Sequence, residues 1–310
     1  MKKLSKKAIF LIIAFFLIAI ASMLSCASHL YNKYIGDQRR DANLTIKSVD
    51  IPDFKIVYAE GGAGDTIILV HGFAGSKDRW LKFAKYFTPK YRVIMPDLPG
   101  FGDSSKPENA KYNIMSQVER LNLFAKELKL TKFHLVGNSM GGSIAGNYAA
   151  TDPQMVKTLA LFDAAGVKAP VKSEYVLLLE KGINPLIIKD VNDYDKVLKF
   201  VFVKPPEIPS FMKPYLAKQH IEAGPMNKKI FNDIRADILI PESKLNRITA
   251  PTLIVWGDSD KLIHISSVPI FEKNIKNSRS VIIKECGHMP MAEKPAEIAS
   301  IYQDFLNGKN

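Results

Sequence analysis

The stretch Lys132–Ala150, KFHLVGNSMGGSIAGNYAA, organises the rest of the chain. Its residues 133–136 are apolar and partly β-branched, as in a buried strand. The turn that follows fits G-x-S-x-G around Ser139, and the small residues after it are typical of a helix packed closely on a sheet. A serine between such a strand and helix sits on a strained turn that exposes its hydroxyl, and flanking glycines remove bulk that would collide there. The stretch therefore predicts a nucleophile elbow with Ser139 as nucleophile.

Apolar runs that suit buried strands alternate with amphipathic segments on both sides of this elbow. The predicted strands are Leu44–Val49, Phe54–Glu60, Thr66–Val70, Arg92–Met95, Phe133–Val136, Thr158–Phe162, Thr252–Trp256 and Val281–Ile283. The predicted helices include Trp80–Phe87, Ile114–Leu128, Val268–Lys276 and Pro295–Leu306. The first two strands read as an antiparallel pair, and the later alternation of strand and helix is typical of a parallel sheet covered by helices. The fold class is therefore α/β.

The alternation stops between residues 164 and 247. Prolines cluster here, and short helical segments that mix lysines with large apolar residues replace the strands. We interpret residues 164–247 as a helical cap inserted into a core formed by residues 44–163 and 248–310.

The N-terminal segment is expected to lie outside the core. Residues 1–26 combine four early lysines with an apolar run from Ala8 to Leu24, which as a helix would span about 25 Å, just short of a ~30 Å hydrocarbon core. Met23-Leu24-Ser25-Cys26 resembles a lipobox, and an uncleaved anchor is the alternative. Both place the body outside the cytoplasm and tethered to a membrane, because the lysines stay inside. Residues 27–43 are polar and read as a linker.

Charge and cysteine content exclude several classes of function. The net charge is +12, but the excess lies largely near the N-terminus, and we find no zinc-ligand cluster or RNA-binding signature. We therefore expect an anionic membrane surface as partner and no nucleic acid. Two cysteines, Cys26 and Cys286, make no disulfide framework.

Three kinds of side chain follow predicted strands in the order serine, acid, histidine. The carboxyl ends of parallel strands share one edge of a sheet, so these side chains are brought together. Ser139 would be the nucleophile and His288, in a glycine loop near the C-terminus, the general base. Asp260 is the preferred acid, while Asp258 after the same strand and Asp163 before the cap stay open as alternatives.

An oxyanion formed on such a serine needs two backbone donors. One is expected to be the N–H of Met140, directly after the nucleophile. The other is expected to come from the loop after the strand Thr66–Val70, which gives the N–H of Phe73. This chemistry requires no metal and no organic cofactor.

The chain from about Gly61 to Leu306 resembles the α/β-hydrolase fold serine hydrolases. HGFAGSKDRW, DLPGFGDSS, HLVGNSMGGSIAGNYAA, PTLIVWGDSDKL and CGHMPMAEKP match the landmarks of that family in order. The resemblance implies a mostly parallel central sheet flanked by helices, with an inserted helical cap, and places the acid at Asp260. Within the superfamily the chain is similar to membrane-anchored monoacylglycerol lipases and related bacterial lipases and esterases. C–C bond hydrolases share G-N-S-M-G-G, but they usually place Trp where this chain has Met289.

The sequence thus predicts a membrane-tethered carboxylic ester hydrolase acting on lipid esters, with acylglycerols as the expected substrates. The alternatives are a C–C bond hydrolase of the same fold and a catalytically silent binding protein with this fold. The sequence leaves open the acyl chain length, the lipidation of Cys26 and the oligomeric state.

Overall fold

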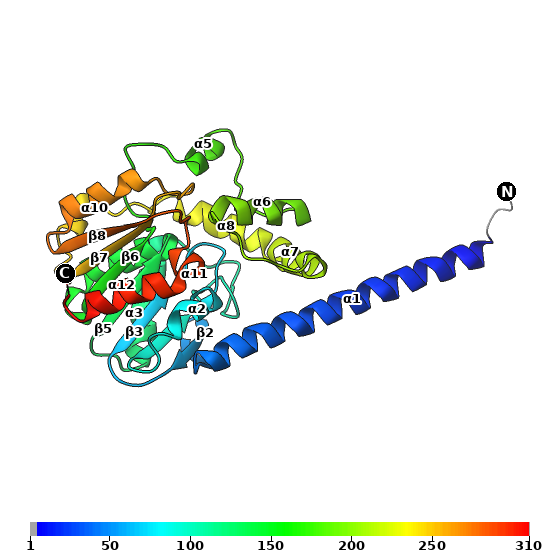
Figure 1. Ribbon diagram of the computed structural model, residues 1–310, viewed down its shortest axis with the longest axis horizontal. Coiled ribbons are helices and arrows are strands. Elements are labelled where there is room, and N and C mark those ends of the chain that lie inside the picture. The colour runs from blue at the N-terminus through cyan, green and yellow to red at the C-terminus, as the bar shows by residue number, and fades with distance from the viewer. Residues whose placement is uncertain (1–4, 310) are drawn as a thin grey trace.

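The computed structural model describes residues 5–309, without most side chains between residues 6 and 24. Lys2 and Lys3 of the expected targeting segment lie outside the described residues. The described strands form one sheet in the order β1-β2-β4-β3-β5-β6-β7-β8 (Figure 1). They are β1 (Thr45–Ile51), β2 (Phe54–Gly61), β3 (Thr66–Val70), β4 (Arg92–Pro96), β5 (Phe133–Asn138), β6 (Val156–Phe162), β7 (Thr252–Gly257) and β8 (Ser278–Ile283).

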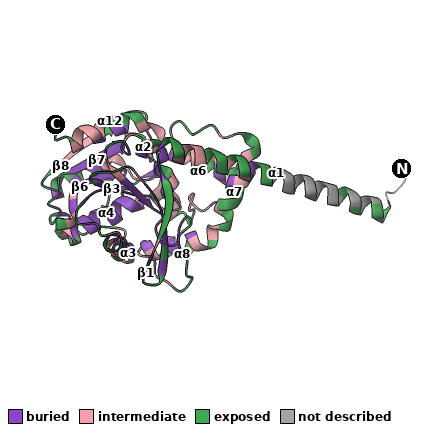
Figure 2. Cartoon of the chain, turned by 90° about the horizontal axis from the view of Figure 1, so that it is seen from below, coloured by how far each residue is buried: buried purple, intermediate pink, exposed green. Residues whose placement is uncertain are grey.

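The pairing of the strands confirms the predicted sheet. β2 pairs antiparallel with β1 and with β4, while β3 to β8 are joined by parallel pairs. Every residue of β3 and β7 is buried, which is the pattern of central strands covered on both faces. Figure 2 shows these strands as buried segments inside the layers of helix.

The central strands supply apolar side chains to both faces of the sheet, because successive side chains point to opposite faces. In β3, Ile68 and Val70 belong to the cluster under α3 (Ile114–Glu127), α4 (Met140–Thr151) and α10 (Val268–Asn274). Ile67 and Leu69 belong to the cluster under α2 (Leu81–Ala84) and α12 (Pro295–Leu306). The sheet is therefore held between two helical layers.

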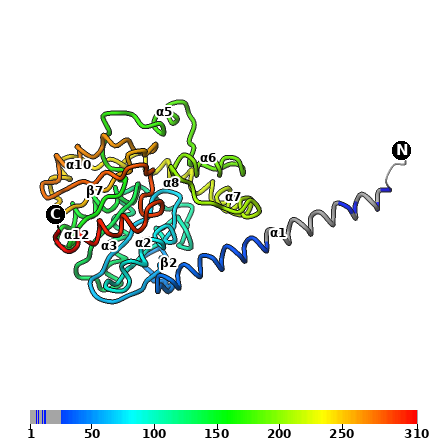
Figure 3. The backbone as a smooth tube through the Cα atoms, in the orientation of Figure 1, coloured from blue at the N-terminus to red at the C-terminus, as the bar shows by residue number. Residues whose placement is uncertain are grey.

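Helices alone lie between β6 and β7, in the segment expected to form the cap. They are α5 (Glu174–Glu180), α6 (Val191–Val201), α7 (Lys213–Glu222), α8 (Gly224–Ile234) and α9 (Glu242–Leu245). Figure 3 shows α5 to α8 gathered at one end of the body. A separate apolar cluster in the cap includes Ile188, Tyr194 and Leu216, whereas Ile230 of α8 and Leu245 of α9 join the core cluster. The insertion is thus partly cap and partly core.

The helix α1 (Lys6–Asp41) differs from the predicted linker. Residues 27–41 continue this helix and contact both the cap and the core. Tyr31 packs at 5.9 Å between ring centroids against Tyr215 of α7, and Arg39 donates two hydrogen bonds to Asp78, of 2.9 and 2.6 Å. The N-terminal part of α1 projects from the body (Figure 1). The segment is therefore a docked helix rather than a loose linker.

Among the residues that the structure describes, no helix has the length and hydropathy needed to span a membrane.

Candidate active site

The predicted elbow is present between β5 and α4. Ser139 has φ 56° and ψ −124°, a strained conformation for a residue other than glycine. A Cβ on Gly137 would collide with the carbonyl oxygen of Gly141, so the strand and the helix approach too closely for any side chain there. The carbonyl of Ser139 accepts the N–H of Gly142 at 2.8 Å, which closes the turn. The serine is half-buried and exposed to the cavity beside it.

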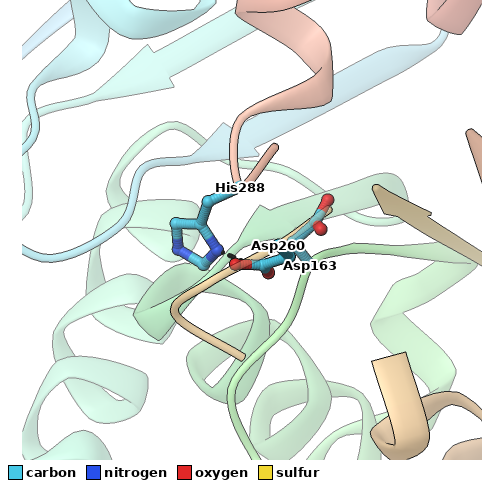
Figure 4. Close-up of side chains that lie close together, drawn as sticks. All are labelled: Asp163, Asp260 and His288. Carbon is cyan, nitrogen blue, oxygen red and sulfur yellow. Dashed lines mark hydrogen bonds and ion pairs between the residues drawn. The ribbon is translucent and has the colours of Figure 1, made fainter. Parts of the chain in front are cut away.

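His288 and Asp260 meet at the carboxyl edge of the sheet, as Figure 4 shows. The His288 Nδ1 and the Asp260 Oδ2 are 2.8 Å apart, and both residues are buried. The other carboxylate oxygen accepts the N–H groups of Leu262, at 2.7 Å, and Ile263, at 3.1 Å. These bonds fix the carboxylate, which orients the imidazole and leaves its Nε2 for the nucleophile.

Ser139 and His288 line the same cavity, but no hydrogen bond joins the hydroxyl of Ser139 to the His288 ring in the described part of the chain. Such bonds are often long before substrate binds and tighten in the reacting complex. The structure thus brings the predicted serine, acid and histidine to one place, with the acid–histidine bond already formed.

Asp163, one of the two alternatives for the acid, lies beside Asp260 but does not bond to His288. It is fully buried, and its Oδ1 accepts the N–H of Gly257 at 3.0 Å, while its Oδ2 has no partner among the described residues. Burial and the neighbouring Asp260 carboxylate raise the pKa of Asp163 well above its ordinary value. The raised pKa favours the protonated form of Asp163, which makes it a poorer partner for an imidazolium than Asp260.

Possible ligand atoms of Asp163, Asp260 and His288 lie within 4.8 Å of one another. They suit a metal poorly, because the His288 Nδ1 already bonds to Asp260 and a cation there would have to displace that proton.

The two predicted oxyanion donors have free N–H groups. Within residues 5–309, neither the N–H of Phe73 nor that of Met140 has an acceptor. For Met140 this follows from its place in the first turn of α4, where backbone donors lack intrahelical partners. The loop that carries Phe73 packs on the nucleophile, since a Cβ on Gly72 would come within 3.0 Å of the Ser139 Cβ.

Two buried groups, His71 and Asp97, hold this loop, and sequence reasoning missed the second. His71 bonds through Nδ1 to the carbonyl of Gly72, at 2.8 Å, and accepts the N–H of Leu98 at Nε2, at 3.0 Å. Burial lowers the pKa of His71, so it stays neutral in this role. The buried Asp97 accepts the Nζ of Lys77, at 2.8 Å, and its backbone N–H, at 2.6 Å. The position of Asp97, two residues after the predicted strand Arg92–Met95, was the available signal.

The cavity beside Ser139 has mostly apolar walls, supplied largely by the segment between β6 and β7. Its aliphatic lining comprises Leu186, Ile188, Val197, Leu198, Val201 and Leu262. His220 of α7, for which the sequence offered no motif, also lines it, and burial lowers the pKa of His220 to about 4. The site therefore joins a polar reacting edge to a chamber that suits an acyl chain.

Comparison with known proteins identifies the family. Residues 65–295 match the family described as the alpha/beta hydrolase fold. This chain belongs to that family. It is 39% identical over 281 residues to Lipase 1 of Psychrobacter immobilis, covering 88% of this chain and 87% of the lipase. It is 29% identical over 302 residues to monoacylglycerol lipase ABHD6 of Rattus norvegicus, covering 93% and 89%.

A solved structure shares the architecture closely. The crystal structure of a membrane phospholipase A, described as a bacterial virulence factor, superposes with a TM-score of 0.90 at 42% sequence identity. The match covers 96% of this chain and 98% of that one. Membership of the hydrolase family and the predicted α/β-hydrolase fold are thereby confirmed.

Proposed function

We propose that this protein hydrolyses carboxylic esters of lipids through an acyl-enzyme on Ser139. The observation that carries the proposal is the 2.8 Å bond between His288 and Asp260 beside the strained Ser139, at the end of an apolar cavity. The names of the similar proteins, two lipases and a phospholipase, support a lipid ester as substrate.

In the acylation step, the Ser139 hydroxyl attacks the ester carbonyl while the Nε2 of His288 takes its proton. The carbonyl oxygen becomes an oxyanion, which the N–H groups of Phe73 and Met140 stabilise. The His288 imidazolium, held by Asp260, then donates the proton to the departing alcohol oxygen as the carbon–oxygen bond breaks.

In the deacylation step, water replaces the alcohol. His288 removes a proton from that water, the resulting oxyanion occupies the same two donors, and collapse releases a fatty acid and regenerates the Ser139 hydroxyl. The acyl chain would lie along the aliphatic wall formed by α6 and the segment before it.

The finer assignments are also proposals. We infer that residues 164–247 act as a cap over the acyl chamber, that acylglycerols are among the substrates, and that residues 1–26 tether the protein to a membrane with the body outside the cytoplasm. The docking of residues 27–41 onto cap and core supports a fixed orientation of the site relative to that tether.

A fluorophosphonate probe tests the proposed nucleophile. Wild-type protein should be labelled on Ser139 and should release fatty acid from monoacylglycerol, and Ser139→Ala should do neither. Labelling without ester hydrolysis, but with cleavage of a vinylogous diketone, would favour a C–C bond hydrolase. A folded wild-type protein that the probe does not label would be a silent binding protein.

A further inference from the structure

Arg79 is the cation of the cavity in which Ser139 lies. It belongs to the short helix η1 (Lys77–Trp80) and is exposed at the cavity wall. Among the described lining residues it is the sole lysine or arginine, and most of the others are aliphatic, aromatic or glycine. A ligand that fills this cavity would cover part of the guanidinium, and an anionic group on that ligand could then pair with it.

The acids nearest to Arg79 in the sequence are already paired with other cations. Asp78, its neighbour, accepts both hydrogen bonds of Arg39 from α1. Lys77 binds the carboxylates of Asp97, at 2.8 Å, and Asp103, at 2.6 Å. Within residues 5–309 the Arg79 guanidinium therefore has no hydrogen-bond or ion-pair partner.

Neutral side chains from three elements lie near Arg79, and the carboxylates closest to them, Asp78 and Asp195, are paired with Arg39 and Lys213. Burial raises the pKa of Tyr31 in α1 and of Tyr194 in α6, and the positive charge of Arg79 opposes both rises. Burial also lowers the pKa of His220 in α7, and Arg79 adds to that effect. Arg79 thus lies where α1, α6 and α7 meet, among neutral side chains.

We propose that Arg79 binds the anionic oxygens of a lipid whose acyl chain occupies the Ser139 cavity. The group would be the phosphate of a phospholipid substrate or the carboxylate of the released fatty acid. Both present paired oxygens that match the planar fork of a guanidinium, whereas a neutral glycerol does not. The inference rests on the proposed lipid hydrolase function and adds a preference for anionic lipids.

The position of Arg79 beside α1 fits a headgroup site. The acyl chain would extend along the aliphatic wall, while Arg79 lies on the side of the cavity near Tyr31 of α1, the helix that projects from the body (Figure 1). With α1 as the proposed tether, this is the side from which a lipid would enter, headgroup near the membrane surface.

Substrate preference of the full-length protein in detergent micelles tests the proposal. We would measure kcat/KM for 1-oleoyl-lysophosphatidylglycerol and for 1-monooleoylglycerol, which share one acyl chain. The ratio of the two values should fall about tenfold to a hundredfold in Arg79→Gln and less in Arg79→Lys, which keeps charge but loses the fork. Arg247→Gln, an exposed arginine away from the cavity, is the matched control and should keep the wild-type ratio.

Binding in a Ser139→Ala background separates the two sources of the anion. Titration with dodecyl phosphate and with dodecanoate should show at least one of them bound about tenfold more weakly after Arg79→Gln. Loss with the phosphate supports a phospholipid headgroup, and loss with dodecanoate alone supports a product site. Unchanged affinities for both ligands together with an unchanged kcat/KM ratio would overturn the proposal. If wild type cleaved neither lipid, the proposed function would fail, and the titration would still test Arg79.

Discussion

The substitution Asp163→Asn tests which of the two carboxyl groups beside His288 is the catalytic acid. Asp163 is buried, and its burial together with the adjacent Asp260 raises its pKa, which favours the neutral form. Asparagine has nearly the same size and no charge, and its oxygen can still accept the Gly257 N–H. We therefore expect kcat/KM at pH 7 to change by less than about threefold. Asp260→Asn should lower kcat by about 10⁴, because the amide stabilises the wrong tautomer of His288.

The same substitution should change how stability depends on pH. An unfolded aspartate has a pKa of about 3.9. Below that pH both the folded and the unfolded states carry the proton, so Asp163 does not make stability depend on pH there. As the pH rises, the unfolded chain releases the proton while the folded chain keeps it, so wild-type stability falls by up to about 1.4 kcal/mol per pH unit until the raised folded pKa is reached. Asparagine does not titrate, so the unfolding free energy of Asp163→Asn should increase relative to that of wild type as the pH rises.

Urea unfolding at pH 5, 6 and 7, paired with hydrolysis of a short p-nitrophenyl ester, measures both effects. Asp258→Asn is the control for activity, since Asp258 lies in the neighbouring turn and contacts Ser259 rather than His288. If the difference in unfolding free energy between Asp163→Asn and wild type stays constant with pH, the pKa of Asp163 is not raised by folding. A 10⁴-fold loss of activity in Asp163→Asn, with a mild Asp260→Asn, would reverse the assignment of the acid.

Three further substitutions test other parts of the molecule. Ser139→Ala should lower kcat by about 10⁶ if the serine, histidine and acid act as a unit, and residual turnover above a few per cent in pure protein would exclude Ser139 as nucleophile. Arg39→Ala removes both bonds to the partly exposed Asp78 and should lower the free energy of unfolding by about 1 kcal/mol, whereas an unchanged urea midpoint would show that α1 docks without this pair. Lys199→Glu, on the exposed side of α6, should weaken binding of a chain beginning at Ala27 to anionic vesicles by about fivefold in low salt, and equal loss of soluble-ester hydrolysis would instead indicate a role in cap folding.

The sheet and the positions of the catalytic candidates could be predicted from the sequence because both depend on local patterns. The apolar run Thr66–Val70 and the proline-headed segment Pro295–Leu306 appear in the structure with the predicted bounds. Parallel strands place their carboxyl ends at one edge, so Ser139, Asp260 and His288 had to converge once the strands were recognised.

The choice between Asp163 and Asp260 could not be made in that way. Both follow strands that end at the same edge, and both are aspartates. What separates them is the conformation of two loops. The Asp260 carboxylate is fixed by the N–H groups of Leu262 and Ile263, whereas the Oδ2 of Asp163 has no hydrogen-bond partner among the described residues. Such differences of a few ångströms leave no periodic signal in a sequence.

The docking of α1 was missed for a related reason. Its residues 27–41 are polar enough to read as a linker, and helical periodicity does not say which partner a helical face meets. The contacts that hold it join residues far apart in the chain, Tyr31 with Tyr215 and Arg39 with Asp78. Tertiary contact overrides local polarity here, as it often does for amphipathic segments.

Hydrogen bonds connect the segment between β6 and β7 to the loop that carries His288. The N–H of His288 donates to the carbonyl of Val201, at the end of α6, with a length of 2.8 Å. Glu293 accepts the N–H of Gly287, at 2.9 Å, and that of Lys204, at 2.7 Å. A displacement of α6 that opened the chamber from this end would break these bonds and release the loop that carries the general base. Substrate must enter without disturbing His288. We therefore expect α5 or α7 to move when the chamber opens, and the end of α6 to stay in place.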